Sequence, residues 1–160
     1  MNLYLPVVVL TIAALIQVTL LPRVSVADVH LELVFLLAIA WSLLRGPVQG
    51  VVWGFVGGLL LDLFSAAPFG VFTLALMFVA SASGIGESAV FRQNLLLPLG
   101  TALVGTLLFH LVTLVLLWTL GWPLDWNAEL FRIILATMVL NTVCMPFVFG
   151  SARQLSQAWG

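Results

Sequence analysis

The chain has 160 residues, of which 63% are hydrophobic and only 7% are charged, and its mean hydropathy is +1.25. A soluble domain carries roughly 25% charged residues, so this composition excludes a soluble globular protein and predicts an integral membrane protein. The net charge of −1 and the absence of lysine do not indicate nucleic acid, or an anionic lipid surface, as the main partner. Because no polar stretch is long enough to fold separately, we predict a single transmembrane domain over residues 1–160.

Apolar runs of membrane-spanning length follow one another along the chain. A spanning helix needs about 20 apolar residues, with a range of roughly 17–25, and the pattern predicts an all-α bundle of six transmembrane helices. The predicted helices cover approximately residues 3–21, 30–44, 48–64, 69–85, 95–120 and 130–150. The first run has the apolar character of a signal peptide, but no Lys or Arg precedes it. We therefore expect it to be a transmembrane helix.

The arginines set the predicted orientation, because cytoplasmic loops are enriched in Lys and Arg. Six spans place both termini on the same side of the membrane. With the termini in the cytoplasm, Arg45, Arg92 and Arg153 are cytoplasmic, whereas Arg23 and Arg132 lie at the outer face. The opposite orientation reverses this ratio. We expect a multi-pass protein of the bacterial cytoplasmic (inner) membrane with both termini inside.

The third predicted helix carries glycine at every fourth position, in Gly46, Gly50, Gly54 and Gly58. Residues four apart lie nearly above one another on a helix, so these glycines predict a bare groove along one face. In membranes, small residues at this spacing let two helix backbones approach closely. The groove receives either another helix of this chain or a helix of a partner, and the sequence leaves both open.

Acids and turn residues flank this groove. Pro47 begins the helix, and Pro68 with Gly70 predicts a turn after it. Asp62 lies two residues before the predicted helix end. It is either a polar anchor that contacts a partner, or an interfacial acid that caps its own turn through Ser65 and nearby backbone N–H groups.

Other polar residues lie inside apolar runs. His110 is near the middle of the fifth predicted helix, and a lone histidine there is more often hydrogen-bonded to a neighbouring helix than a ligand. Metal binding needs three or four ligands, and the sequence has no clustered His and Cys motif; we expect no metal and no cofactor. We likewise expect interhelical hydrogen bonds from four further polar residues in apolar runs, Gln17, Gln49, Asn141 and Thr142.

These residues together resemble a known family signature. The segments that carry the resemblance are Arg45-Gly46-Pro47, Gly50, Gly54-Phe55, the run Gly57 to Leu63 with Asp62, Ser65, and Pro68 with Gly70. They look like the signature of the rod shape-determining protein MreD family, and the match is strongest from Glu32 to Gly70. The chain departs from the family at Leu31-Glu32-Leu33, where the family usually carries Pro-Asp-Leu. The acid is kept as Glu32, and the proline is absent.

The resemblance implies a non-enzymatic scaffold subunit of the bacterial cell-elongation machinery, the rod complex, which directs lateral peptidoglycan synthesis. Such subunits bind MreC, which has one transmembrane helix, and through MreC they connect to MreB filaments, to RodA and to its partner transpeptidase. The fold it implies is similar to the substrate-binding subunits of energy-coupling-factor transporters. Whether the chain also forms a homodimer is open.

The resemblance also assigns roles to individual residues. The residues expected to serve helix packing or partner binding are Gly46, Gly50, Gly54, Gly57 and Gly58. Glu32, Asp62 and Arg45 are expected to be polar anchors, the two acids by fixing the outer turns. On this hypothesis, Gly54→Leu disrupts assembly.

A competing interpretation is the substrate-binding subunit of a vitamin transporter. Such subunits commonly dock on their energising partner through small residues spaced by four in the first helix. Here Leu10, Ala14 and Val18 form one such row, and Ala13 and Gln17 another, and neither is a row of small residues. A retained ligand would favour this alternative.

Intramembrane enzymes are a further alternative. Lipoprotein signal peptidases of similar length use two aspartates, but Asp62 and Asp125 lack the expected Asn-x-x-Asp context. A rhomboid-type protease needs a serine in a Gly-x-Ser-x-Gly-like setting, and no serine here has one. We therefore expect no enzymatic activity.

Overall fold

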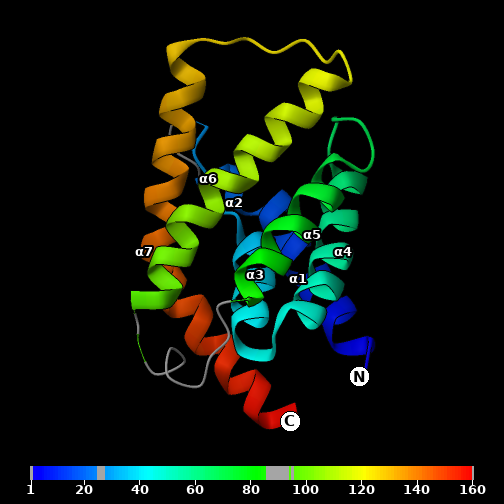
Figure 1. The fold of residues 1–160 in the computed structure, drawn as a ribbon, viewed down its shortest axis with the longest axis vertical. Helices are drawn as coiled ribbons and strands as arrows, with labels where there is room; N and C mark the ends of the chain where they lie inside the picture. The colour runs from blue at the N-terminus through cyan, green and yellow to red at the C-terminus, as the bar shows by residue number, and fades with distance from the viewer. Residues whose placement is uncertain (1, 25–27, 86–93, 95, 160) are drawn as a thin grey trace.

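The computed structural model describes residues 2–24, 28–85, 94 and 96–159, and the regular structure there is helical (Figure 1). Seven α-helices follow one another in this part of the chain: α1 (Tyr4–Thr19), α2 (Leu21–Val24), α3 (Leu33–Arg45), α4 (Pro47–Phe64), α5 (Val71–Gly84), α6 (Leu96–Thr119) and α7 (Ala128–Trp159). The prediction of six helices missed α2, a four-residue helix that follows directly after α1. The last helix also extends beyond residue 150, as far as Trp159.

Helix length separates the elements into two groups. Among the described residues, α4, α6 and α7 are long and apolar enough to cross a membrane, whereas α1, α3 and α5 are shorter apolar helices. At a rise of 1.5 Å per residue, the 13 residues of α3 span only about 20 Å, less than the roughly 30 Å hydrocarbon core of a bilayer. The structure therefore supports an all-helical membrane protein with three long apolar helices, and the arrangement of six spans remains a prediction.

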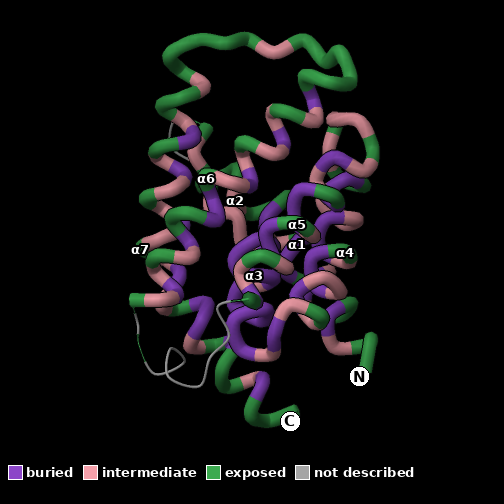
Figure 2. The backbone as a smooth tube through the Cα atoms, in the orientation of Figure 1, coloured by how far each residue is buried: buried purple, intermediate pink, exposed green. Residues whose placement is uncertain are grey.

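The centre of the bundle is α3. Its apolar residues are buried along almost the whole length of the helix, from Val34 to Leu44. It contacts α1, α4, α5, α6 and α7. Figure 2 shows that buried residues, in purple, gather around α3, whereas exposed residues dominate the connection between α6 and α7. These contacts place α3 at the centre, and the pairs α4–α5 and α6–α7 also pack extensively against each other.

The two ends of the bundle differ. Both termini lie at the same end, and the connection between α6 and α7 reaches furthest from them at the other end (Figure 1). Pro146 lies inside α7, and the helix changes direction in its C-terminal part. Because proline removes a backbone hydrogen bond and clashes with the preceding turn, it accounts for this bend.

Candidate functional site

The glycine row of α4 packs against α5 of the same chain. A Cβ atom added to Gly54 would lie 2.9 Å from the carbonyl oxygen of Leu76, and one added to Gly50 would lie 2.9 Å from that of Ala80. Gly58 approaches the Phe72 carbonyl in the same way, at 2.8 Å. These contacts are with backbone atoms, which cannot move aside cheaply. In the structure, the surface along this row is therefore occupied by α5.

Two of the predicted glycines have other surroundings. Gly57 lies against α3, where an added Cβ would lie 2.8 Å from the side chain of Val34, and the side chain of Leu76 in α5 is also near, at 3.3 Å. Gly46 lies outside the helix, between α3 and α4, with φ at +92°. Because side-chain-bearing residues rarely adopt such a φ, Gly46 serves the turn between the two helices. Pro47 follows it as the first residue of α4, where proline is favoured.

Asp62 caps the helix that follows its own. Its side chain is buried, with 3% exposure. One carboxylate oxygen accepts the backbone N–H of Phe72 at 3.0 Å, and the other accepts the N–H of Thr73 at 3.0 Å and the Thr73 hydroxyl. These donors belong to the first turn of α5, where backbone N–H groups lack helical partners and a negative charge is stabilised. The predicted cap within its own turn is absent, since Ser65 instead accepts the N–H of Ala67.

The turn between α4 and α5 brings Asp62 to this position. Gly70 directly precedes α5 with φ at +99°, and a Cβ there would meet nothing within 4 Å. Backbone conformation, and not lack of space, thus accounts for glycine at this position. Pro68 also contributes to the turn, because its carbonyl accepts the N–H of Val71.

Arg45 connects the end of α3 to the end of α7. Its Nε donates to the Ser156 hydroxyl at 2.9 Å, and its Nη2 donates to the Ser156 carbonyl at 2.5 Å. A cation is favourable near the C-terminus of a helix, where carbonyl groups are unpaired. Arg45 thus joins the ends of two helices through a residue that lies 111 positions away in the sequence.

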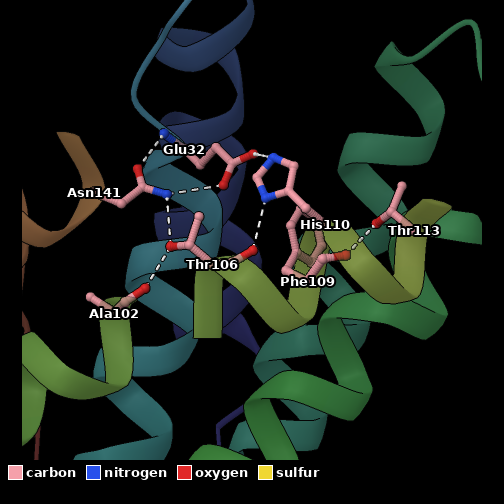
Figure 3. Close-up of polar contacts among 7 residues, drawn as sticks. All are labelled: Glu32, Ala102, Thr106, Phe109, His110, Thr113 and Asn141. Atoms are coloured by element: carbon pink, nitrogen blue, oxygen red, sulfur yellow. Dashed lines mark hydrogen bonds and ion pairs between the residues drawn. The ribbon is translucent and has the colours of Figure 1, made fainter. Parts of the chain in front are cut away.

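Figure 3 shows a cluster of polar side chains where α3 meets α6 and α7. The Asn141 side chain donates to a carboxylate oxygen of Glu32 at 3.0 Å and to the Thr106 hydroxyl at 3.2 Å. Its amide oxygen accepts the backbone N–H of Glu32 at 3.2 Å. The other carboxylate oxygen of Glu32 lies 3.3 Å from Nε2 of His110, and Nδ1 of His110 lies 2.8 Å from the Thr106 carbonyl. One acid therefore links three helices.

The cluster lies deep relative to the ends of its helices. His110 is followed by nine more residues of α6, and Asn141 is preceded by 13 residues of α7, distances of roughly 14 and 20 Å along the helices. Glu32 was expected to fix the outer turn. It does occupy the position before α3, but its side chain makes no capping hydrogen bond there and instead binds α6 and α7.

A cavity of about 410 Å³ opens beside this cluster. Glu32, His110 and Gln17 contribute polar groups to its wall, and the apolar part includes four phenylalanines, Phe35, Phe64, Phe72 and Phe109. The oxygen of the Gln17 amide accepts the N–H of Val34 at 2.9 Å. The nitrogen of the same amide has no acceptor among the described residues, although the side chain is buried. The volume lies within the roughly 300–1,000 Å³ range of small-molecule sites.

Sequence reasoning identified some members of the cluster and missed others. Asn141, Gln17 and His110 were predicted to make interhelical hydrogen bonds. Thr106 was not singled out, because threonine is common in apolar helices and its hydroxyl bonds its own helix, at the carbonyl of Ala102. Thr142 was expected to connect helices, but its hydroxyl donates to Met138 within α7. Among the described residues, no three His, Cys, Asp or Glu side chains come together as metal ligands.

Comparison with known families identifies the family to which the chain belongs. The family model described as rod shape-determining protein MreD matches residues 1–155, which is essentially the whole chain. The chain belongs to the MreD family. It is accordingly a bacterial rod-shape-determining membrane protein, and it belongs to a family of structural proteins and not to a known enzyme family. No curated protein and no solved structure matches it, so the likeness to energy-coupling-factor subunits remains a prediction.

Proposed function

We propose that this MreD-family chain is a non-enzymatic scaffold subunit of the rod complex, with six spans and both termini in the cytoplasm. The family match over residues 1–155 carries the proposal. Two observations support the orientation. Both termini lie at one end of the bundle (Figure 1), as an even number of crossings requires. At that same end Arg45 contacts the C-terminal part of α7, which also carries Arg153, so two cations face one side.

The direct partner in this proposal is MreC, which the chain binds through the single transmembrane helix of MreC. MreC then connects the chain to MreB, to RodA and to its partner transpeptidase, so that the complex directs lateral peptidoglycan synthesis. Since α5 occupies the glycine row of α4, the MreC helix must contact another lipid-facing surface. A groove of about 400 Å³ between α5 and α6, lined in part by Ala82, Ser83, Gly100 and Gly105, is an open surface with small residues, and the test begins there.

The experiment is co-expression of the tagged chain with MreC of its own organism, followed by purification in mild detergent. The proposal predicts a stoichiometric complex. Gly100→Leu is expected to fill part of the groove, because Gly100 lines the groove and a Cβ there meets nothing within 4 Å. Gly150→Leu is the matched control, since a Cβ at Gly150 likewise meets nothing within 4 Å but lies on α7. Loss of MreC with Gly100→Leu alone places the partner in the groove, whereas a wild-type chain that purifies without MreC contradicts the proposal.

A second candidate function is the small-molecule-binding subunit of a transporter. The observation that favours it is the cavity beside Glu32 and His110, with the unpartnered Gln17 amide nitrogen in its wall. Mass spectrometry of the purified chain tests this alternative. A small molecule that is retained by the wild-type chain and lost from Gln17→Leu would support it, and a chain free of small molecules would remove it.

A further inference from the structure

A second polar cavity lies at the opposite end of the bundle, where the termini meet. It has a volume of about 240 Å³ and is bounded by the start of α1, the end of α3, the start of α4 and the end of α7. Its wall includes Arg45, Gln49 and the tryptophans Trp41, Trp53 and Trp159. Tryptophan is enriched at the level of lipid headgroups, which agrees with the position of this cavity at the end of the bundle.

The polar groups of this cavity are mainly hydrogen-bond donors. The two contacts with Ser156 fix the Arg45 guanidinium and leave its Nη1 group without an acceptor among the described residues. The Gln49 amide oxygen accepts the indole N–H of Trp41 at 3.0 Å, which leaves the amide nitrogen of Gln49 as a further donor. None of the described residues that line the cavity is acidic. The wall therefore carries a net positive charge.

Trp53 adds a buried donor. Its side chain is 1% exposed and stacks on Trp41, with ring centroids 4.3 Å apart. The indole N–H of Trp53 has no acceptor among the described residues, although the residue lines the cavity. An unpaired buried donor costs about 1–3 kcal/mol, so an acceptor in the cavity would be stabilising.

We propose that this cavity binds the phosphate group of an anionic membrane lipid. A guanidinium presents its N–H groups in a planar fork that matches phosphate oxygens. The volume is below the roughly 300–1,000 Å³ of typical small-molecule sites, so it suits a headgroup and not a larger metabolite. The exposed residues Tyr4, Val8 and Ile12 form an apolar row on α1, which contributes Leu5 and Pro6 to the wall. This row provides a surface for acyl chains outside the cavity.

The two cavities differ in the charge of the side chains in their walls. The wall of the cavity beside Glu32 carries a carboxylate, which repels a phosphate. Among the described residues, Arg45 is the charged side chain in the wall of the other cavity, and it attracts a phosphate. The proposal concerns one headgroup at one site, which is compatible with a chain of net charge −1. It is independent of the binding of MreC.

The test is native mass spectrometry of the full chain, purified in mild detergent and supplied with phosphatidylglycerol or with phosphatidylcholine of the same acyl chains. We expect one phosphatidylglycerol per wild-type chain, and no comparable retention of phosphatidylcholine. Arg45→Gln should weaken retention about tenfold, the effect of losing one charge-assisted hydrogen bond. Trp53→Phe keeps the stacked ring and removes only the N–H, and it should weaken retention about threefold. Arg153→Gln, which removes a cation outside the cavity, is the matched control.

Several results would overturn the proposal. Equal losses in Arg45→Gln and Arg153→Gln would show that retention follows surface charge alone. Equal retention of both lipids would exclude recognition of the anionic headgroup. Displacement of the lipid by millimolar inorganic phosphate would assign the site to a soluble anion instead of a lipid. If Arg45→Gln does not fold because α7 loses its contact, unchanged retention in Trp53→Phe would still contradict the proposal.

Discussion

The α4–α5 pair and the α6–α7 pair join the bundle by different means. Between α4 and α5, glycines bring one backbone against the other, and the Asp62 carboxylate closes the end of the pair. Where α6 and α7 meet α3, side chains make the connection through the hydrogen bonds of Asn141 and Glu32. The first junction leaves no space along its glycine row, whereas a cavity opens beside the second.

This difference indicates what each kind of pattern means in the chain. The row of glycines marks where two helices of the same chain pack closely together. It therefore indicates internal helix packing and does not by itself indicate a partner-binding surface. Isolated polar residues in apolar helices mark junctions that are held by side chains. Because side-chain contacts leave more space between helices, the polar junction is where a ligand or a conformational change is easier to accommodate.

The largest effect is expected at the closed junction, from Asp62→Ala. This change leaves the partly buried backbone N–H of Phe72 and the buried N–H of Thr73 without acceptors, which should lower the free energy of unfolding by about 2–5 kcal/mol. Asp62→Asn keeps one acceptor oxygen and should cost less. Thermal unfolding of the chain in detergent measures both variants, and equal stability of Asp62→Ala and wild type would show that the cap is not needed.

At the polar junction, Asn141→Leu should have the next largest effect. The substitution removes the bonds to Glu32 and Thr106 and leaves the N–H of Glu32 unpaired, at a cost of about 1–3 kcal/mol. Thr142→Val is the control on the same helix, because the Thr142 hydroxyl bonds only within α7. Chemical denaturation should separate the two variants. Similar losses in both would mean that Asn141 makes no specific contribution.

The smallest effect concerns the pair formed by Glu32 and His110. Their side chains are 14% and 20% exposed and lie 3.3 Å apart, and side-chain contacts between membrane helices average about 0.6 kcal/mol. A double-mutant cycle with Glu32→Gln and His110→Phe should give a coupling energy of about 0.5–1 kcal/mol. A coupling energy of zero would show that the two side chains are neighbours without a stabilising interaction.

Local features of the sequence were predicted well, since they depend on residues close together in the chain. The break at Pro47 and the fourfold glycine spacing follow from helix geometry and from the steric properties of proline, whereas Gly46 was expected in the packing row and lies in the turn before α4. Asp62 was expected near a helix end, but the direction in which its carboxylate points depends on the turn through Gly70 and was not predictable.

Contacts between distant segments could not be predicted. Glu32 and Asn141 are 109 residues apart, and the sequence around either residue does not indicate that the other is its partner. Their contact depends on how far α6 and α7 extend beyond α3, which is a property of the packed bundle and not of any one helix. For the same reason the cavity beside Gln17 and His110 could not be inferred from the composition of single helices.

The central claim is that the glycine row is an internal packing surface, and thermal unfolding of the chain purified without MreC tests it most directly. Gly58→Ala places a Cβ 2.8 Å from the carbonyl oxygen of Phe72, whereas Gly100→Ala meets nothing within 4 Å. We predict that Gly58→Ala alone lowers the Tm, by an overpacking cost of about 1–3 kcal/mol, and that Gly100→Ala leaves the Tm unchanged or raises it slightly. An unchanged Tm for Gly58→Ala would contradict the claim that the row is an internal packing surface.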